Sequence, residues 1–284
     1  MSVSSVPLKE IQQRLQSDEV LLQYFVIDTR LITVTVSREE LKSTESAVGD
    51  LEDLVRRFRQ NLQDSKDEAL PQSRVLYDRL LRPVEGTIRG KALVIVPHGV
   101  LHYLPFAALH DGKGPVIERH ALRYLPSASV LRFLDPQRSG PLKPVLIFGN
   151  PDLGKPEFDL PNAEVEAKLI ANMQQGSQVL LRREATVAAF KKLAPGFRFV
   201  HIASHGEFNP VEPLKSRLLL SQADRQDGSL TVGDLYGTQL DADLVTLSAC
   251  ETGLGKILTG DDVLGLTRGF LYAGTANVVA SQWQ

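Results

Sequence analysis

Residues 199–206 read FVHIASHG, and residues 244–253 read LVTLSACETG. Each stretch starts as a short, mainly apolar run, which predicts a buried strand. Each run then passes into small and polar residues, where the predicted strand ends. The first stretch ends on His205 and Gly206. The second contains Cys250, which is the single cysteine of the chain. These two strand ends are the starting point for predicting both the fold and the site.

Strands and helices alternate on either side of these stretches. The pattern predicts further strands over 145–148, 179–181 and 276–280, and helices over 163–173, 187–193 and 263–272. Val165, Leu169 and Met173 lie on one side of the first helix, and Thr186 is placed as the N-cap of the second. This rhythm predicts an α/β fold with a mostly parallel sheet, flanked by helices and joined by right-handed crossovers.

The earlier part of the chain predicts a second α/β unit. The runs 20–27 and 31–36, separated by three turn-type residues, predict a hairpin, and 92–96 and 122–125 predict strands. Helices are expected from residue 51 and after Pro71, the second with Val75, Leu76, Leu80 and Leu81 on its inner face. Residues 136–144 turn to Pro, Gly, Ser and charge, which indicates a boundary. We therefore predict a lead-in over 1–19, an N-terminal half over 20–140 and a catalytic half over 141–284.

Composition excludes several classes of protein. The chain has 284 residues, 43% of them hydrophobic and 23% charged, with a formal net charge of −2. These values are ordinary for a soluble protein, and they give no basis for an extensive nucleic-acid surface. No run approaches the roughly 20 apolar residues of a membrane span, and the first residues lack a signal peptide's apolar region. A single cysteine allows no disulfide within the chain, so a reducing, cytoplasmic location is expected.

His205 and Cys250 suit nucleophilic catalysis. They lie about 45 residues apart, close to the roughly 50-residue interval of the caspase pattern, and sites in parallel sheets collect at the carboxyl ends of strands. A nearby imidazole raises the thiolate fraction of a cysteine, and a thiolate attacks peptide carbonyls. The backbone N–H groups of Gly206 and Cys250 are expected to form the oxyanion hole.

Other interpretations of these and neighbouring residues compete with this one. A packed structural thiol is the simplest alternative for Cys250, and His201, in mid-strand, is expected to be a hydrogen-bonded structural residue. His98 and His102 lie in a predicted loop without the glutamate of a zinc motif, and no P-loop or nucleophile-elbow motif is present. We expect no metal and no cofactor. Asp261 is expected to cap a helix, with a secondary role in binding a basic substrate side chain.

Several segments together resemble the CHAT domain, a caspase- and separase-like peptidase module often found behind tetratricopeptide repeats in bacteria. They are LVIVPHGVLHYLPFAAL (93–109), LPSASVL (125–131), GNPD (149–152), HIASHG (201–206), LSACETG (247–253), GDDVLGLTRGFLYAG (260–274) and VASQW (279–283). The resemblance implies a caspase-like catalytic half after an inactive, pseudo-caspase-like half, with His205 and Cys250 as the catalytic dyad. It also implies a further helix and strand after Trp283, so a domain truncated at its C-terminus is expected, with Asp261 and Trp283 near the substrate pocket.

The predicted function is that of a cytoplasmic cysteine endopeptidase acting on a protein substrate and regulated by a tetratricopeptide-repeat segment or another partner. No nucleic acid or membrane partner is expected. The alternative is a catalytically silent, caspase-like binding or scaffold module. A small-molecule hydrolase or transferase is a third interpretation, which would require a closed apolar pocket.

Overall fold

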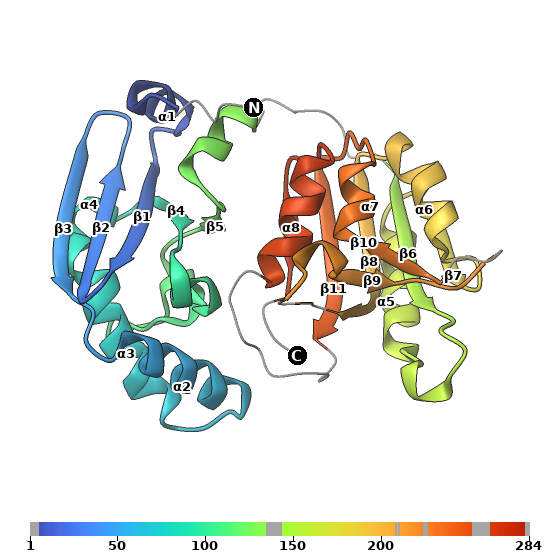
Figure 1. Ribbon diagram of the computed structural model, residues 1–284, viewed down its shortest axis with the longest axis horizontal. Coiled ribbons are helices and arrows are strands. Elements are labelled where there is room, and N and C mark those ends of the chain that lie inside the picture. Colours follow the sequence, from blue (N-terminus) through green and yellow to red (C-terminus); the bar gives the residue numbers. More distant parts are fainter. Residues whose placement is uncertain are drawn as a thin grey trace. The chain divides into compact units, whose positions relative to one another are not determined.

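The computed structural model describes residues 6–134, 144–207, 209, 211–223, 227–251 and 262–281; the side chains of 213, 250, 251 and 262–264 are outside the described part. The chain divides into two compact units, Met1–Leu134 and Asp135–Gln284, and each unit has its own sheet (Figure 1). The expected boundary at 136–144 adjoins this division, and its residues 136–143 lie outside the described residues.

The first unit has a mixed five-stranded sheet in the order β3-β2-β1-β4-β5. The strands are β1 (Glu19–Ile27), β2 (Arg30–Val36), β3 (Leu41–Ala47), β4 (Ala92–Val96) and β5 (Leu122–Tyr124). β1 and β2 form the predicted antiparallel hairpin, whose turn places Asp28 at a φ of 52°. β4 runs parallel to both β1 and β5, so the hairpin extends a parallel core of three strands.

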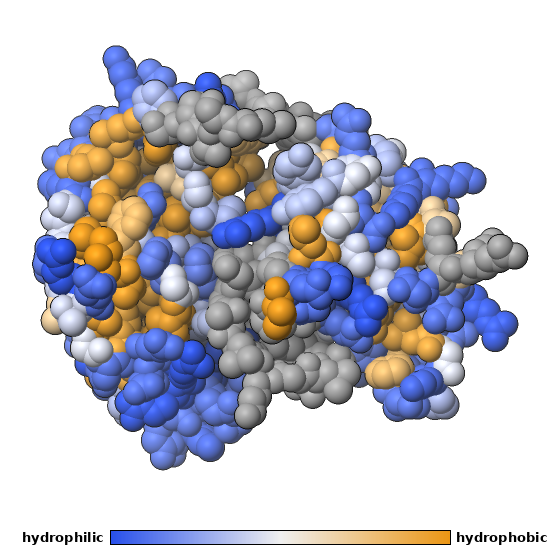
Figure 2. Space-filling view, in the orientation of Figure 1, coloured by the Kyte–Doolittle hydropathy of each residue, from blue (hydrophilic) through white to orange (hydrophobic). Residues whose placement is uncertain are grey.

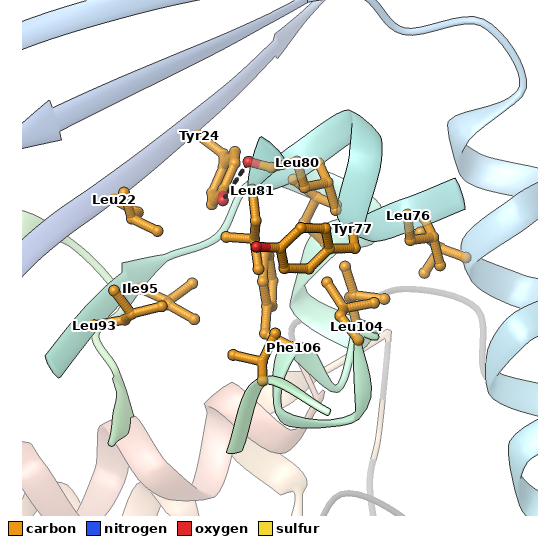
Figure 3. Packing of buried hydrophobic residues seen from close by; sticks show 14 of the residues in the cluster. Leu22, Tyr24, Leu76, Tyr77, Leu80, Leu81, Leu93, Ile95, Leu104 and Phe106 are labelled. Carbon is orange, nitrogen blue, oxygen red and sulfur yellow. Dashed lines mark hydrogen bonds between the residues drawn. The ribbon is translucent and has the colours of Figure 1, made fainter. Parts of the chain in front are cut away.

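Helices cover both faces of this sheet. They are α1 (Leu8–Arg14), α2 (Leu51–Gln63), α3 (Ala69–Leu80) and the short α4 (Glu85–Ile88). Figure 3 shows side chains from the strands meeting those of α3 and of the loop after β4, including Leu22, Ile95, Leu76 and Phe106. Tyr24 donates a hydrogen bond to the Leu80 carbonyl at 3.2 Å, and burial raises the pKa of its phenol far above the ordinary value. The opposite face packs on α1 and the 3-10 helix Ala128–Phe133.

Two details of this unit differ from the sequence prediction. Strand β3 was not predicted, because LKSTESA shows no apolar alternation; it pairs with β2 over seven positions as an exposed edge strand. Val75 is 42% exposed on α3, so its placement on the inner face was wrong, whereas Leu76, Leu80 and Leu81 are buried as predicted. The outward surfaces of α2 and α3 are mainly hydrophilic (Figure 2).

The second unit has a seven-stranded, mostly parallel sheet, which confirms the predicted fold class. Its parallel strands lie in the order β7-β6-β8-β11-β12; β9 pairs antiparallel with the last three residues of β8, and β10 pairs antiparallel with β9. The bounds are β6 (Val145–Pro151), β7 (Gln178–Arg182), β8 (Phe199–Glu207), β9 (Arg217–Leu219), β10 (Ser229–Thr231), β11 (Leu244–Glu251) and β12 (Val278–Ala280).

Four helices cover this sheet: α5 (Pro161–Met173), α6 (Val187–Leu193), α7 (Val232–Tyr236) and α8 (Asp262–Tyr272). Phe190 of α6, Leu235 of α7 and Phe270 of α8 share one apolar cluster with inward residues of β6, β8 and β11. Thr186 caps α6 as predicted, accepting a hydrogen bond from Ala189 N at 3.1 Å. On α5, the predicted apolar stripe of Val165, Leu169 and Met173 faces solvent.

Helix α5 approaches the sheet through small residues. Ala167 of α5 is fully buried, and a Cβ added to Gly149 of β6 would lie only 2.5 Å from the Ala167 Cβ. Residues 149–151, which lie beyond the strand predicted over 145–148, belong to β6 itself, where the register with β7 shifts between Gly149 and Pro151. Within the described residues, no helix is long and apolar enough to cross a membrane.

Candidate catalytic site

The parallel strands place His205 and Cys250 at matching positions. β8 and β11 pair in parallel register from Leu244↔Phe199 to Glu251↔Gly206, and in this register Cys250 lies opposite His205. Positions opposite one another on neighbouring strands fall on the same face of a pleated sheet. The two strand ends are therefore neighbours, and the two backbone positions share one face near the carboxyl ends of their strands.

The strand order gives this location a second significance. From β6 the chain passes to β7 on one side and then crosses to β8 on the other, so the topological switch point lies between β6 and β8. In open α/β sheets, ligands bind outside the carboxyl ends of the strands at such a point. His205 stands at the end of β8, and the segment that follows β6 reaches it through the short 3-10 helix Pro156–Phe158.

The His205 ring is held by Phe158 in two ways. His205 Nε2 lies 3.0 Å from the Phe158 carbonyl oxygen, and the two rings meet edge to face with centroids 5.6 Å apart. A carbonyl oxygen has no proton to donate, so Nε2 carries the proton in this hydrogen bond. The Nδ1 lone pair of the neutral ring is then the free basic site. His205 is 7% exposed, so few alternative ring positions are available.

A polar cluster lies further along the same face. His201 is register partner of Thr246, and Ser248 is partner of Ala203, so these positions alternate with the apolar residues that face α6, α7 and α8. Ser248 Oγ donates to Glu166 Oε2 of α5 at 3.1 Å, and His201 Nε2 lies 3.1 Å from Glu166 Oε1. The His201–Glu166 approach is at ion-pairing distance without good hydrogen-bond alignment.

Burial lowers the pKa of His201, and the Glu166 carboxylate opposes this effect to a smaller extent. His201 is therefore neutral at pH 7. His201 lies in mid-strand as predicted and is 6% exposed, but its contact with Glu166 is an approach at ion-pairing distance rather than the predicted hydrogen bond. Its Glu166 partner was not foreseen, because nothing in the sequence of α5 indicates which strand residue it meets.

Among the remaining predicted site residues, Gly206 is the one whose surroundings the structure describes. Gly206 lies in β8 between Glu251 of β11 and Leu218 of β9. A Cβ added at Gly206 would lie 3.6 Å from the Ala249 Cβ, on the face opposite His205, so its missing side chain does not open space beside the imidazole. Asp261 and Trp283 lie outside the described residues, as does the side chain of Cys250.

Three of the four histidines of the first unit have backbone partners close to a ring nitrogen. His98 Nδ1 accepts a hydrogen bond from Val26 N at 3.2 Å, His110 Nδ1 accepts one from Gly112 N at 2.9 Å, and His120 Nδ1 lies 2.7 Å from the Lys91 carbonyl oxygen. In the part of the chain that the structure describes, no three His, Cys, Asp or Glu side chains are grouped so that they would hold a metal ion.

Two hollows lie at opposite ends of the second sheet. One, of about 410 Å³, is lined by Phe158 together with Lys155, Asp159 and Arg182, and so adjoins the segment that contacts His205. A larger one, of about 920 Å³, is lined by Leu240 and by other residues that precede β11 and β12. The larger hollow is therefore at the amino ends of these strands, away from His205.

The segment that follows β6 was missing from the sequence-based site. Phe158 contributes its backbone carbonyl, a group that every residue has, so the residue type at this position does not indicate the role. Asn150 stood within a recognised GNPD segment, but the sequence assigned it no role. Its side chain makes hydrogen bonds to Asp159 and Leu160, the two residues directly after Phe158.

Comparison with known proteins adds independent information. A family model described as CHAT domain matches residues 70–284. Tetratricopeptide repeat protein 28 of Homo sapiens is 29% identical over 272 residues, and that of Mus musculus is 28% identical over 272 residues. In each case the match covers 76% of this chain but 11% of the relative, so the chain spans a small part of the length of these relatives.

Proposed function

The chain belongs to the CHAT domain family, and from this premise we propose that it is a cysteine endopeptidase that hydrolyses peptide bonds of a protein substrate through Cys250 and His205. The observation that carries the proposal is the pairing of the two positions: Cys250 is the register partner of His205 on neighbouring parallel strands. A nucleophile and its base must lie within hydrogen-bonding reach, and the adjacent in-register backbone positions support such an arrangement.

The hydrogen bond to Phe158 supports a definite assignment of the ring nitrogens. Because Nε2 donates to the Phe158 carbonyl, Nδ1 is the nitrogen available to take the thiol proton. When the ring is protonated, the carbonyl dipole faces the new positive charge and stabilises the imidazolium. Phe158 thus supplies an orienting group through its backbone.

The proposed reaction proceeds by acyl transfer. His205 Nδ1 takes the proton of the Cys250 thiol, and the thiolate attacks the carbonyl carbon of the scissile bond. The imidazolium then returns the proton to the leaving amine as the carbon–nitrogen bond breaks, which leaves a thioester on Cys250. A water molecule, deprotonated by His205, attacks the thioester, and the acid product leaves while the thiol is restored.

The other proposed roles follow the family resemblance. The backbone N–H groups of Gly206 and Cys250 are the proposed oxyanion donors, each worth about 3–4 kcal/mol in comparable enzymes. Asp261 and Trp283 are proposed as neighbours of the substrate pocket. A lone catalytic thiol suits a reducing compartment such as the cytoplasm. The names of the relatives support a tetratricopeptide-repeat segment or partner as the regulator.

The test is labelling with a panel of peptide acyloxymethyl ketones, followed by intact mass. These probes alkylate an active-site thiol after binding as substrate mimics. We expect one adduct on the wild type, a preference among the peptides, and no adduct on Cys250→Ala or His205→Ala. A folded wild type that takes up no probe across the panel would refute the peptidase proposal and favour the scaffold interpretation.

A further inference from the structure

We propose that Asn150 is a positioning residue for the His205 base, because its side chain fixes the backbone carbonyl of Phe158 that orients the imidazole. The inference rests on the proposed function, since it assigns His205 the role of base there. It goes beyond the dyad by naming the side chain on which the orientation of that base depends.

Asn150 occupies an unusual position at the end of β6. It is completely buried, and its φ of 48° lies in the left-handed region, where asparagine is one of the few tolerated residues other than glycine. This conformation coincides with the register shift between Gly149 and Pro151. The backbone turns its side chain toward the segment after the 3-10 helix Pro156–Phe158, as the hydrogen bonds show.

Both ends of the Asn150 amide are used. Oδ1 accepts a hydrogen bond from Leu160 N at 2.8 Å, and Nδ2 donates one to Asp159 Oδ1 at 3.0 Å. The Phe158 carbonyl belongs to the peptide bond that joins Phe158 to Asp159. Two anchors on the next two residues therefore restrict this peptide plane, and its oxygen lies 3.0 Å from His205 Nε2.

The anchoring depends on an amide rather than on polarity alone. An aspartate at position 150 would still accept from Leu160 N, but it would place a carboxylate against the Asp159 carboxylate. Arg182 also pairs with Asp159, yet its side chain is 45% exposed, so this ion pair contributes little rigidity by comparison with a buried hydrogen bond. Asn150 is thus the buried anchor of the segment.

The first experiment compares Asn150→Gly with a matched control. Glycine keeps the left-handed backbone without strain and removes both hydrogen bonds. The control is Ser221→Ala, because Ser221 is 2% exposed and also makes two hydrogen bonds nearby, accepting from Asp152 N and donating to the Arg182 carbonyl. Ser221 holds the start of the segment after β6 at Asp152 and not the residues that follow Phe158, so its loss reports the effect of removing buried hydrogen bonds nearby without releasing the two anchors beside the Phe158 carbonyl.

Two readouts are needed. Nitrogen-15 NMR of labelled histidines reports which ring nitrogen of His205 is protonated and how fast that proton exchanges with water. The rate of Cys250 alkylation by an acyloxymethyl ketone reports the chemistry. In Asn150→Gly we expect the slowly exchanging Nε2–H signal to disappear and the alkylation rate to fall about ten- to hundred-fold, since misplacing a catalytic group by about 1 Å can cost about a hundred-fold. Ser221→Ala keeps both properties.

A swap experiment covers the case in which Asn150→Gly does not fold. Asn150→Asp alone is expected to lose the Nε2–H signal, whereas Asn150→Asp combined with Asp159→Asn restores one amide facing one carboxylate and recovers the signal. The inference is overturned if Asn150→Gly retains both the signal and the rate, if Ser221→Ala loses them equally, or if the swap recovers nothing.

Failure of the proposed function is a different result from failure of this inference. If the wild type takes up no probe, the peptidase proposal fails, but the Nε2–H comparison still decides whether Asn150 fixes the His205 ring. If the wild type reacts and the Asn150 variants behave like it, the dyad stands and Asn150 has no positioning role.

Discussion

Substituting Gly149 with alanine tests how closely β6 and α5 must approach. A Cβ at this position would lie 2.5 Å from the Ala167 Cβ and 3.2 Å from the Ala163 carbonyl oxygen, both on α5. Carbon atoms in favourable contact are about 3.5–4.0 Å apart, so α5 must retreat by about 1 Å. Overpacking of this kind destabilises the folded protein by about 1–3 kcal/mol. Alanine also restricts the backbone of the unfolded chain, which offsets about 0.4–1 kcal/mol of this loss.

We therefore expect Gly149→Ala to lower the free energy of unfolding by about 1–2 kcal/mol, measured by urea denaturation followed by circular dichroism. Gly196→Ala is the matched control, because no atom lies within 4 Å of the position its Cβ would take. It is expected to be neutral or slightly stabilising.

The double substitution Gly149→Ala/Ala167→Gly identifies the contact responsible. Ala167→Gly alone costs about 1 kcal/mol in helix propensity, but in the Gly149→Ala background it removes the shortest of the new contacts. The combined loss of stability should therefore be smaller than the sum of the single losses by about 0.5–2 kcal/mol. A neutral Gly149→Ala, or single effects that simply add, would refute the close packing of α5 on β6.

Three further predictions concern the second unit. Burial lowers the pKa of His201 in the folded protein, so as the pH falls the unfolded chain binds a proton at this residue before the folded protein does. The folded protein therefore keeps its stability above about pH 6.5 and loses stability as the pH falls below that value. In His201→Gln, the free energy of unfolding, measured by urea titration, should fall less between pH 7 and pH 5 than in the wild type. An equal fall in the two proteins would contradict this prediction. Thr231→Ala removes half of a capping box with Asp234 and should cost about 1 kcal/mol, whereas an unchanged urea midpoint would argue against that cap. Gly206→Ala keeps the backbone N–H and fits its surroundings, so the rate of probe labelling should stay within about three-fold of the wild type; a hundred-fold loss would show that the glycine itself is required.

Much of the second unit could be predicted from sequence, because its strands are continuous apolar runs with abrupt ends. The stretches ending at His205 and Cys250 are strands of a mostly parallel sheet, as the alternation of strands and helices predicted; their adjacency as β8 and β11 is a finding of the structure. The catalytic roles of these residues stay predictions. In the first unit, the hairpin and the helix that begins at residue 51 followed equally directly from the residue pattern.

The parts that escaped prediction have physical reasons. β3 has few apolar residues, because an edge strand with exposed side chains needs no buried face. The Phe158 carbonyl and the Asn150 amide act through backbone atoms and long-range hydrogen bonds, which local sequence does not encode. The stripe led by Val165 has correct helical spacing, but α5 packs on the sheet through Ala167 and directs the stripe outward.

The central claim is that His205 controls the reactivity of Cys250, and the most direct test is the rate of iodoacetamide alkylation as a function of pH. Cys250 is the single cysteine, so no other thiol contributes to the signal. We predict that the wild type reacts rapidly at pH 6–7, and that His205→Gln shows a profile with its midpoint at about 8.5, the ordinary value for a free thiol. Identical profiles for the two proteins, both centred near 8.5, would contradict the pairing of Cys250 with His205.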